Sequence, residues 1–247
     1  MNLKIYNDYQ ELSDAAATLM LDLVKHKPGA LCCFATGDSP KLTYQLLVEK
    51  AKAQGVDFSR CRMIGLDEWM GIDTDNPGSC HRYLHDYLFT PLGIRADQVH
   101  LFNAFPADEK EECRIMDEWI ATHGGIDLMV VGVGINGHIG FNEPGTPLES
   151  TAHAAELEEI TKTIGQKYFP GKVAIGKGLT VGLQQVLQAN TLVMLANGAK
   201  KAPVIRRAVN DEIGNRFPAT LLRSHPNSFL MVDREAASEL KPEQHHG

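Results

Sequence analysis

Residues 126–145, IDLMVVGVGINGHIGFNEPG, join an apolar run to a glycine-rich segment. The run at 126–133 is apolar almost throughout, which is typical of a strand buried on both faces of a parallel sheet. Similar runs alternate with helical patterns at 3–6, 30–35, 61–66, 99–102, 191–196 and 228–233. This alternation predicts α/β architecture: a single Rossmann-like domain over residues 1–247, whose parallel-rich sheet carries helices on both faces.

Helical periodicity follows most of these runs. We expect helices near 9–26, 40–54, 107–123 and 199–209, and another that begins near Ser79. Asp8 and Glu11 have the spacing of a capping box at the start of the first helix. Residues 150–170 form a Glu-rich helical pattern between two stretches with glycine and proline, and we expect them to be a mobile lid.

The overall composition narrows the classes of partner. A net charge of −7 argues against nucleic acid or an anionic membrane surface. No stretch approaches eighteen apolar residues, and the N-terminal segment lacks the apolar core of a signal peptide. The five cysteines show no Cys-x-x-Cys pair, which suits reduced thiols better than disulfides or zinc. We expect a cytoplasmic protein with no metal, and the sequence is equally compatible with a monomer and a homo-oligomer.

The glycines at 132–137 match the Gly-x-Gly-x-x-Gly pattern of dinucleotide sites. That pattern binds a nucleotide when its glycines open a long helix. No long helix is expected here, because the following residues include Pro144, Gly145 and Pro147. We therefore expect no cofactor. A catalytic loop explains His138 and Glu143 better than a bare turn does.

His138 is the strongest acid/base candidate, because an imidazole exchanges protons near neutral pH. Asn136 and Glu143 flank it, and either is able to hold one ring nitrogen. Asp67 and Glu68 follow another apolar run, at the sheet edge where ligands of open parallel sheets bind. One of these carboxylates is expected to face the crevice as a proton shuttle with a raised pKa, and its position directly after the strand favours Asp67.

The segment TGDSP (36–40) joins a strand to a helix. Ser39 as N-cap and Pro40 as first helical residue would leave free N–H groups that suit a phosphate. A well-capped helix without any ligand explains the segment equally well. Asp38 counts against an anion site unless its side chain points away, and Lys201 is the expected cation, with Lys200 as a solvated alternative.

Together these residues resemble the glucosamine-6-phosphate deaminase (isomerase) family over about residues 1–235. The resemblance rests on TG-SP at 36–40, on LDE at 66–68 followed by an aromatic residue, and above all on NGHIGFNEP at 136–144. The galactosamine-6-phosphate isomerase branch is also close. The related 6-phosphogluconolactonases share the fold and a Gly-His loop but lack the Phe-Asn-Glu-Pro continuation.

The resemblance implies conversion of glucosamine 6-phosphate to fructose 6-phosphate and ammonia, or of the galacto epimer to tagatose 6-phosphate and ammonia. By analogy, Asp67 would move the C2 proton, and His138 would open the ring with help from Glu143 and Asn136. The phosphate of this amino-sugar partner would be bound by Thr36, Gly37, Ser39, Lys167 and Lys201. The alternatives are lactone hydrolysis by water that His138 activates, and a non-catalytic sugar-phosphate sensor.

Some positions depart from the family pattern. Trp69 replaces a common tyrosine, which leaves the epimer open, and Asp38 takes a place that is usually small and uncharged. Lys167 replaces a frequent arginine, and residue 136 is aspartate in some relatives. Residues 151–155 lack the basic residues of allosteric relatives, so we expect no activation by an N-acetyl-sugar phosphate.

Overall fold

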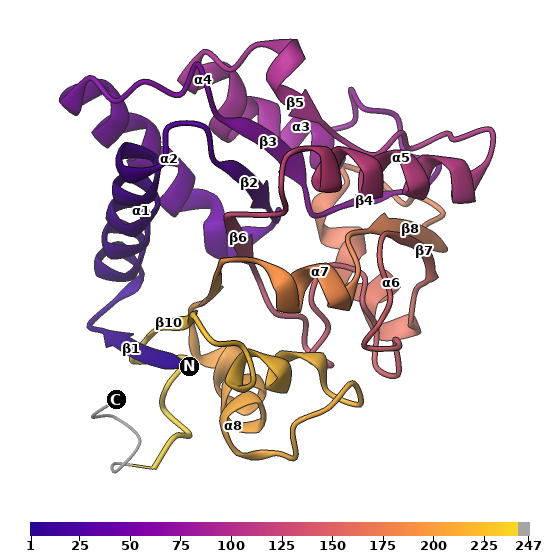
Figure 1. Ribbon diagram of the computed structural model, residues 1–247. Helices are drawn as coiled ribbons and strands as arrows, with labels where there is room; N and C mark the ends of the chain where they lie inside the picture. Colours follow the sequence, from indigo (N-terminus) through magenta and orange to yellow (C-terminus); the bar gives the residue numbers. More distant parts are fainter. Residues whose placement is uncertain (242–247) are drawn as a thin grey trace.

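The computed structural model describes residues 1–241, so the last six residues of the expected domain, 242–247, lie outside it. A seven-stranded parallel sheet forms the centre, in the order β1-β10-β9-β6-β2-β3-β5 (Figure 1). Its strands are β1 (Asn2–Tyr6), β2 (Leu31–Phe34), β3 (Arg62–Gly65), β5 (Val99–His100), β6 (Leu128–Val131), β9 (Thr191–Ala196) and β10 (Ser228–Asp233). The predicted α/β domain with a parallel-rich sheet is confirmed.

Helices cover both faces of this sheet, and the strands supply each face with alternate apolar side chains. Cys32 and Phe34 of β2 pack in a cluster with α1 (Tyr9–His26) and α2 (Asp38–Gln54). The same cluster includes residues of α3 (Cys80–Leu84) and of the π-helical turn η1 (His85–Phe89), which leads to α4 (Thr90–Leu92). Leu31 and Cys33 pack on the other face against α5 (Glu109–Thr122), and α7 (Leu183–Gln188) and α8 (Ala202–Asn210) join that cluster.

A second, antiparallel sheet was not predicted from the sequence. It has three short strands in the order β4-β8-β7: β4 (Asp67–Trp69), β8 (Lys177–Thr180) and β7 (His153–Glu156). Strands this short carry too few residues for a clear periodic signal. The sheet continues directly from β3 through β4, so it fixes the chain immediately after the central sheet at Asp67.

The segment expected to be one helical lid is built differently. It contains β7, then α6 (Glu159–Gly165), then the 3₁₀ turn η3 (Gln166–Tyr168). The helix near 199–209 likewise begins with a 3₁₀ turn, η4 (Ala199–Lys201), and two further 3₁₀ turns are η2 (Ala96–Gln98) and η5 (Pro218–Arg223). The mobility of the 150–170 segment stays a prediction.

Within residues 1–241, no helix combines the length and apolar character needed to cross a membrane. All five cysteines are buried and have free thiols.

Candidate active site

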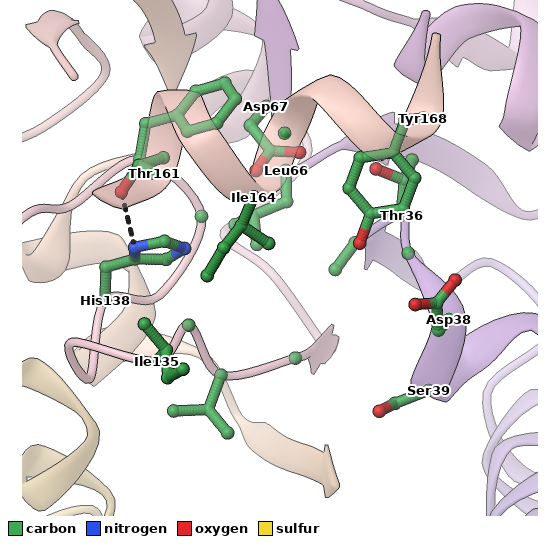
Figure 2. A pocket seen from close by; sticks show the side chains of 18 of the residues that line it. Thr36, Asp38, Ser39, Leu66, Asp67, Ile135, His138, Thr161, Ile164 and Tyr168 are labelled. Atoms are coloured by element: carbon green, nitrogen blue, oxygen red, sulfur yellow. Dashed lines mark hydrogen bonds between the residues drawn. The ribbon is translucent and has the colours of Figure 1, made fainter. Parts of the chain in front are cut away.

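A cavity of about 480 Å³ lies at the carboxyl ends of β2, β3, β6 and β9 (Figure 2). The α6–η3 segment forms the opposite wall. Side chains with polar or charged groups line it at Thr36, Asp38, Ser39, Asp67, Cys80, His138, Thr161, Thr163, Lys167, Tyr168, Lys200 and Lys201. Of the residues predicted to form the site, the pocket lining includes all except Asn136 and Glu143.

Asp67 is the carboxylate that faces the pocket from the end of the central sheet (Figure 2). Burial and, to a smaller extent, the negative charge of Glu68 raise the pKa of its carboxyl from 3.8 to about 7, although a bond from Cys80 acts the other way. The Cys80 thiol donates that bond, with Sγ 3.7 Å from Oδ1. Asp67 therefore exchanges a proton near neutral pH, as a catalytic base must.

Glu68 has a separate, structural task. Its side chain is 1% exposed and accepts bonds from the backbone N–H of Trp69, Cys80 and His81 and from the Ser79 hydroxyl. These bonds tie the start of α3 to β4. Of the two adjacent acids, only Asp67 lines the pocket.

His138 is held from behind by a carboxylate and a hydroxyl. Its Nδ1 lies 3.4 Å from Oε2 of Glu143 and 3.3 Å from Oγ1 of Thr161 (Figure 2). The other nitrogen, Nε2, is directed into the pocket over Gly134. A Cβ at position 134 would lie 2.3 Å from Nε2, so the glycine leaves the space that the imidazole occupies. The glycine pattern thus accommodates His138.

Glu143 provides a fixed negative charge beside the imidazole. Burial by itself raises the pKa of this carboxyl, but bonds from His138, Thr161 and Asn136 outweigh burial and lower the pKa to about 2. Glu143 is therefore ionised throughout the neutral range and places a negative charge 3.4 Å from Nδ1 of His138.

Asn136 acts on Glu143 and not on the imidazole, so of the two residues expected to hold a ring nitrogen only Glu143 does so. Nδ2 of Asn136 donates to Oε2 of Glu143 at 2.8 Å and to Oε2 of Glu158 at 2.7 Å. Its Oδ1 accepts the backbone N–H of His138 at 3.3 Å. Thr161 takes the second place beside Nδ1, and sequence reasoning missed it because it comes 23 residues later, inside the expected lid.

The loop after β2 begins its helix earlier than predicted. Helix α2 starts at Asp38 with Gly37 as N-cap, so the assignment of Ser39 as N-cap and Pro40 as first helical residue was wrong. Gly37 has φ 122°, a left-handed region open to glycine, which lets the chain turn two residues sooner. Ser39 instead donates its hydroxyl proton to Oδ1 of Asn197 at 2.8 Å, which joins the loops after β2 and β9.

Two lysines approach this loop, and both already have partners. Lys201 donates to the backbone carbonyl of Val133, with Nζ 2.6 Å from the oxygen, and burial followed by the charge of Lys167 lowers its pKa. Lys167 lies with Nζ 2.5 Å from Oδ2 of Asp38. Asp38 thus points toward the pocket, and Lys200 is an exposed further cation on the lining.

An aromatic cluster supports the wall opposite the sheet. Trp69 lines the pocket and packs on Phe141, with ring centroids 4.6 Å apart, and on Phe169 at 5.9 Å. A Cβ at Gly165 would lie 2.7 Å from the Trp69 ring, so α6 approaches this indole closely. Trp69 therefore connects β4 to the α6–η3 segment.

Among residues 1–241, no group of three or more His, Cys, Asp and Glu side chains is arranged to hold a metal ion. The pocket lining supplies carboxylate, imidazole and ammonium groups. Figure 2 shows His138 and the 36–39 loop on opposite sides of the pocket, with Asp67 between them, and Lys167 joins the loop side through its contact with Asp38.

Comparisons with known proteins are consistent along the whole chain. The model of the family "Glucosamine-6-phosphate isomerases/6-phosphogluconolactonase" matches residues 8–231. A glucosamine-6-phosphate deaminase of Shouchella clausii is 37% identical over 246 residues, which cover 99% of this chain and 100% of that protein. Glucosamine-6-phosphate deaminase 1 of Bacillus subtilis is 35% identical over 235 residues, 95% of this chain and 97% of the relative.

Solved structures show the same relationship. A monomeric glucosamine-6-phosphate deaminase superposes with a TM-score of 0.93 at 34% identity, covering 97% of this chain and 100% of that one. The 6-phosphogluconolactonase of Trypanosoma brucei superposes with a TM-score of 0.79 at 19% identity, over 97% and 98% of the two chains. The second likeness concerns the fold alone.

Proposed function

Because the chain belongs to the family of glucosamine-6-phosphate isomerases and 6-phosphogluconolactonases, we propose that it is a glucosamine-6-phosphate deaminase. The reaction is an aldose–ketose isomerisation that yields fructose 6-phosphate and ammonia. The observation that carries the proposal is that Asp67 and His138 line the same pocket as Lys167 and Lys201. The proposed setting is the cytoplasm.

Ring opening is assigned to His138. Its Nε2 takes the proton of the C1 hydroxyl and delivers a proton to the ring oxygen, which opens the hemiacetal to the aldehyde. The anionic Glu143, 3.4 Å from Nδ1, stabilises the transient imidazolium. Asn136 is a positioning residue, because it orients Glu143 and the His138 backbone.

Isomerisation is assigned to Asp67. Its carboxylate removes the proton from C2 and returns it to C1, while a second proton passes from the amine to O1. The product is a C2 imine, which water hydrolyses to the ketone and ammonia. A carboxyl whose pKa is about 7 suits this task, since it must both accept and donate the proton.

The phosphate is assigned to the side of the pocket opposite His138. Thr36, Gly37 and Ser39 lie at the start of α2, where backbone N–H groups favour an anion, and Lys167 and Lys201 supply positive charge. Binding the phosphate there holds C1 and C2 between the two catalytic groups, so remote binding energy orients the reacting atoms.

Ammonia release from purified protein tests the proposal, with glucosamine 6-phosphate and galactosamine 6-phosphate compared in the presence of EDTA. We expect turnover of the gluco substrate, loss of turnover in Asp67→Asn, and wild-type turnover in Asp22→Asn on the outer surface of α1. Ammonia from the galacto epimer alone would reassign the substrate and direct attention to Trp69. Hydrolysis of 6-phosphogluconolactone without ammonia release, or ligand binding without any turnover, would refute the deaminase assignment.

A further inference from the structure

An ion pair that the proposed chemistry does not require crosses the phosphate end of the pocket. Nζ of Lys167, on η3, lies 2.5 Å from Oδ2 of Asp38, the first residue of α2. The two residues are 129 positions apart in the chain, and both line the pocket. The contact joins the loop after β2 to the segment that forms the opposite wall.

Asp38 stands between two residues assigned to the phosphate. Gly37 precedes it and Ser39 follows it, and its carboxylate is drawn on the pocket side of the helix start (Figure 2). A carboxylate and a phosphate accept hydrogen bonds from the same ammonium and repel each other at short range. Both therefore compete for Lys167.

The pair is open to solvent and exchangeable. The side chains of Lys167 and Asp38 are 49% and 70% exposed, and ion pairs at such positions add little stability. Lys201 differs, because its Nζ is held by the carbonyl oxygen of Val133, which carries no net charge. Of the two lysines assigned to the phosphate, Lys167 is the one that an acidic side chain already occupies.

We propose that Asp38 lowers the affinity of the pocket for phosphate: in the free protein its carboxylate holds Lys167, and a phosphate-bearing ligand binds by displacing it. The inference rests on the proposed function, since it assumes that this end of the pocket receives a sugar phosphate. Competition acts on substrate and product alike, so it weakens capture of the one and favours release of the other.

Titration calorimetry with inorganic phosphate tests the inference on the full chain. Asp38→Asn keeps the shape of the side chain and removes its charge, and Asp38→Ser serves as a second variant if folding is impaired. We expect either change to tighten phosphate binding about two- to fivefold, the fold-change that corresponds to an exposed ion pair. The matched control is Asp14→Asn, which breaks a pair with Lys50 at 2.7 Å between α1 and α2 and is expected to leave phosphate binding unchanged.

Other results would overturn the inference. Unchanged affinity in a folded Asp38 variant would show that the carboxylate does not compete. Weaker affinity would show that Asp38 positions Lys167 for the phosphate, and undetectable binding by every form would remove the phosphate site itself. The titration needs no turnover, so tighter binding without ammonia release would refute only the deaminase assignment, whereas ammonia release with unchanged affinity would refute only the role of Asp38.

Discussion

Replacing Asp67 by asparagine is expected to abolish turnover and, at the same time, to stabilise the fold above neutral pH. The folded protein raises the pKa of this carboxyl from 3.8 to about 7, chiefly by burial. Folding therefore favours the protonated carboxyl, and the stability of the wild type relative to the variant falls as pH rises from about 4 to about 7. Asparagine does not ionise and escapes this cost.

The difference between pKa 3.8 and about 7 corresponds to about 4 kcal/mol at 1.36 kcal/mol per pH unit. Because Asp67 is half-buried and faces the water of the pocket, we expect about 2–4 kcal/mol in favour of Asp67→Asn at pH 8, and under about 1 kcal/mol near pH 4. Urea unfolding of both proteins across this range measures the gap. If the difference in unfolding free energy between the two proteins stayed constant with pH, the argument that ionising Asp67 destabilises the fold would be refuted.

Three further outcomes follow from the geometry of the site. The kcat/KM of the wild type is expected to fall below about pH 7, because protonation removes the base at Asp67, and a profile flat to pH 5 would contradict this. Cys80→Ala is expected to move that decline to higher pH, because the thiol bond lowers the pKa of Asp67; Cys80→Ser, which restores a donor, is the control. Gly134→Ala is expected to reduce kcat by about 100-fold or more, because the added Cβ displaces the His138 ring. If a crystal structure of this variant showed the ring displaced while kcat stayed at the wild-type value, the proposed role of His138 would be contradicted.

The central sheet was predictable because its inner strands β2, β6 and β9 are apolar and buried along almost their whole length. Runs such as Leu128–Val131 carry that pattern within a few residues, and the polar residues that follow them, Asp67 and His138, fall at the carboxyl edge by topology alone. The choice of Asp67 over Glu68 for the pocket also followed from position, because Asp67 comes directly after the predicted strand at 61–66.

Contacts between distant segments were not predictable in the same way. The three-residue strand β4 is defined by its pairing with β8, more than a hundred residues later, and not by its own composition. Thr161 beside His138 and Lys167 beside Asp38 both depend on how the α6–η3 segment is placed over the sheet. The start of α2 was misassigned for a local reason, because the left-handed backbone of Gly37 takes over the capping position from Ser39.

Gly134 has a wider consequence for glycine-rich turns. Its missing side chain makes room for His138, so a residue of the same polypeptide fills the space that a nucleotide takes in other sheets. The imidazole is part of the chain, and the contacts of its Nδ1 with Glu143 and Thr161 hold it over this glycine. A glycine pattern after a strand thus indicates that another group approaches the backbone closely. The residues that follow the glycines determine whether that group is a bound ligand or a side chain of the same protein.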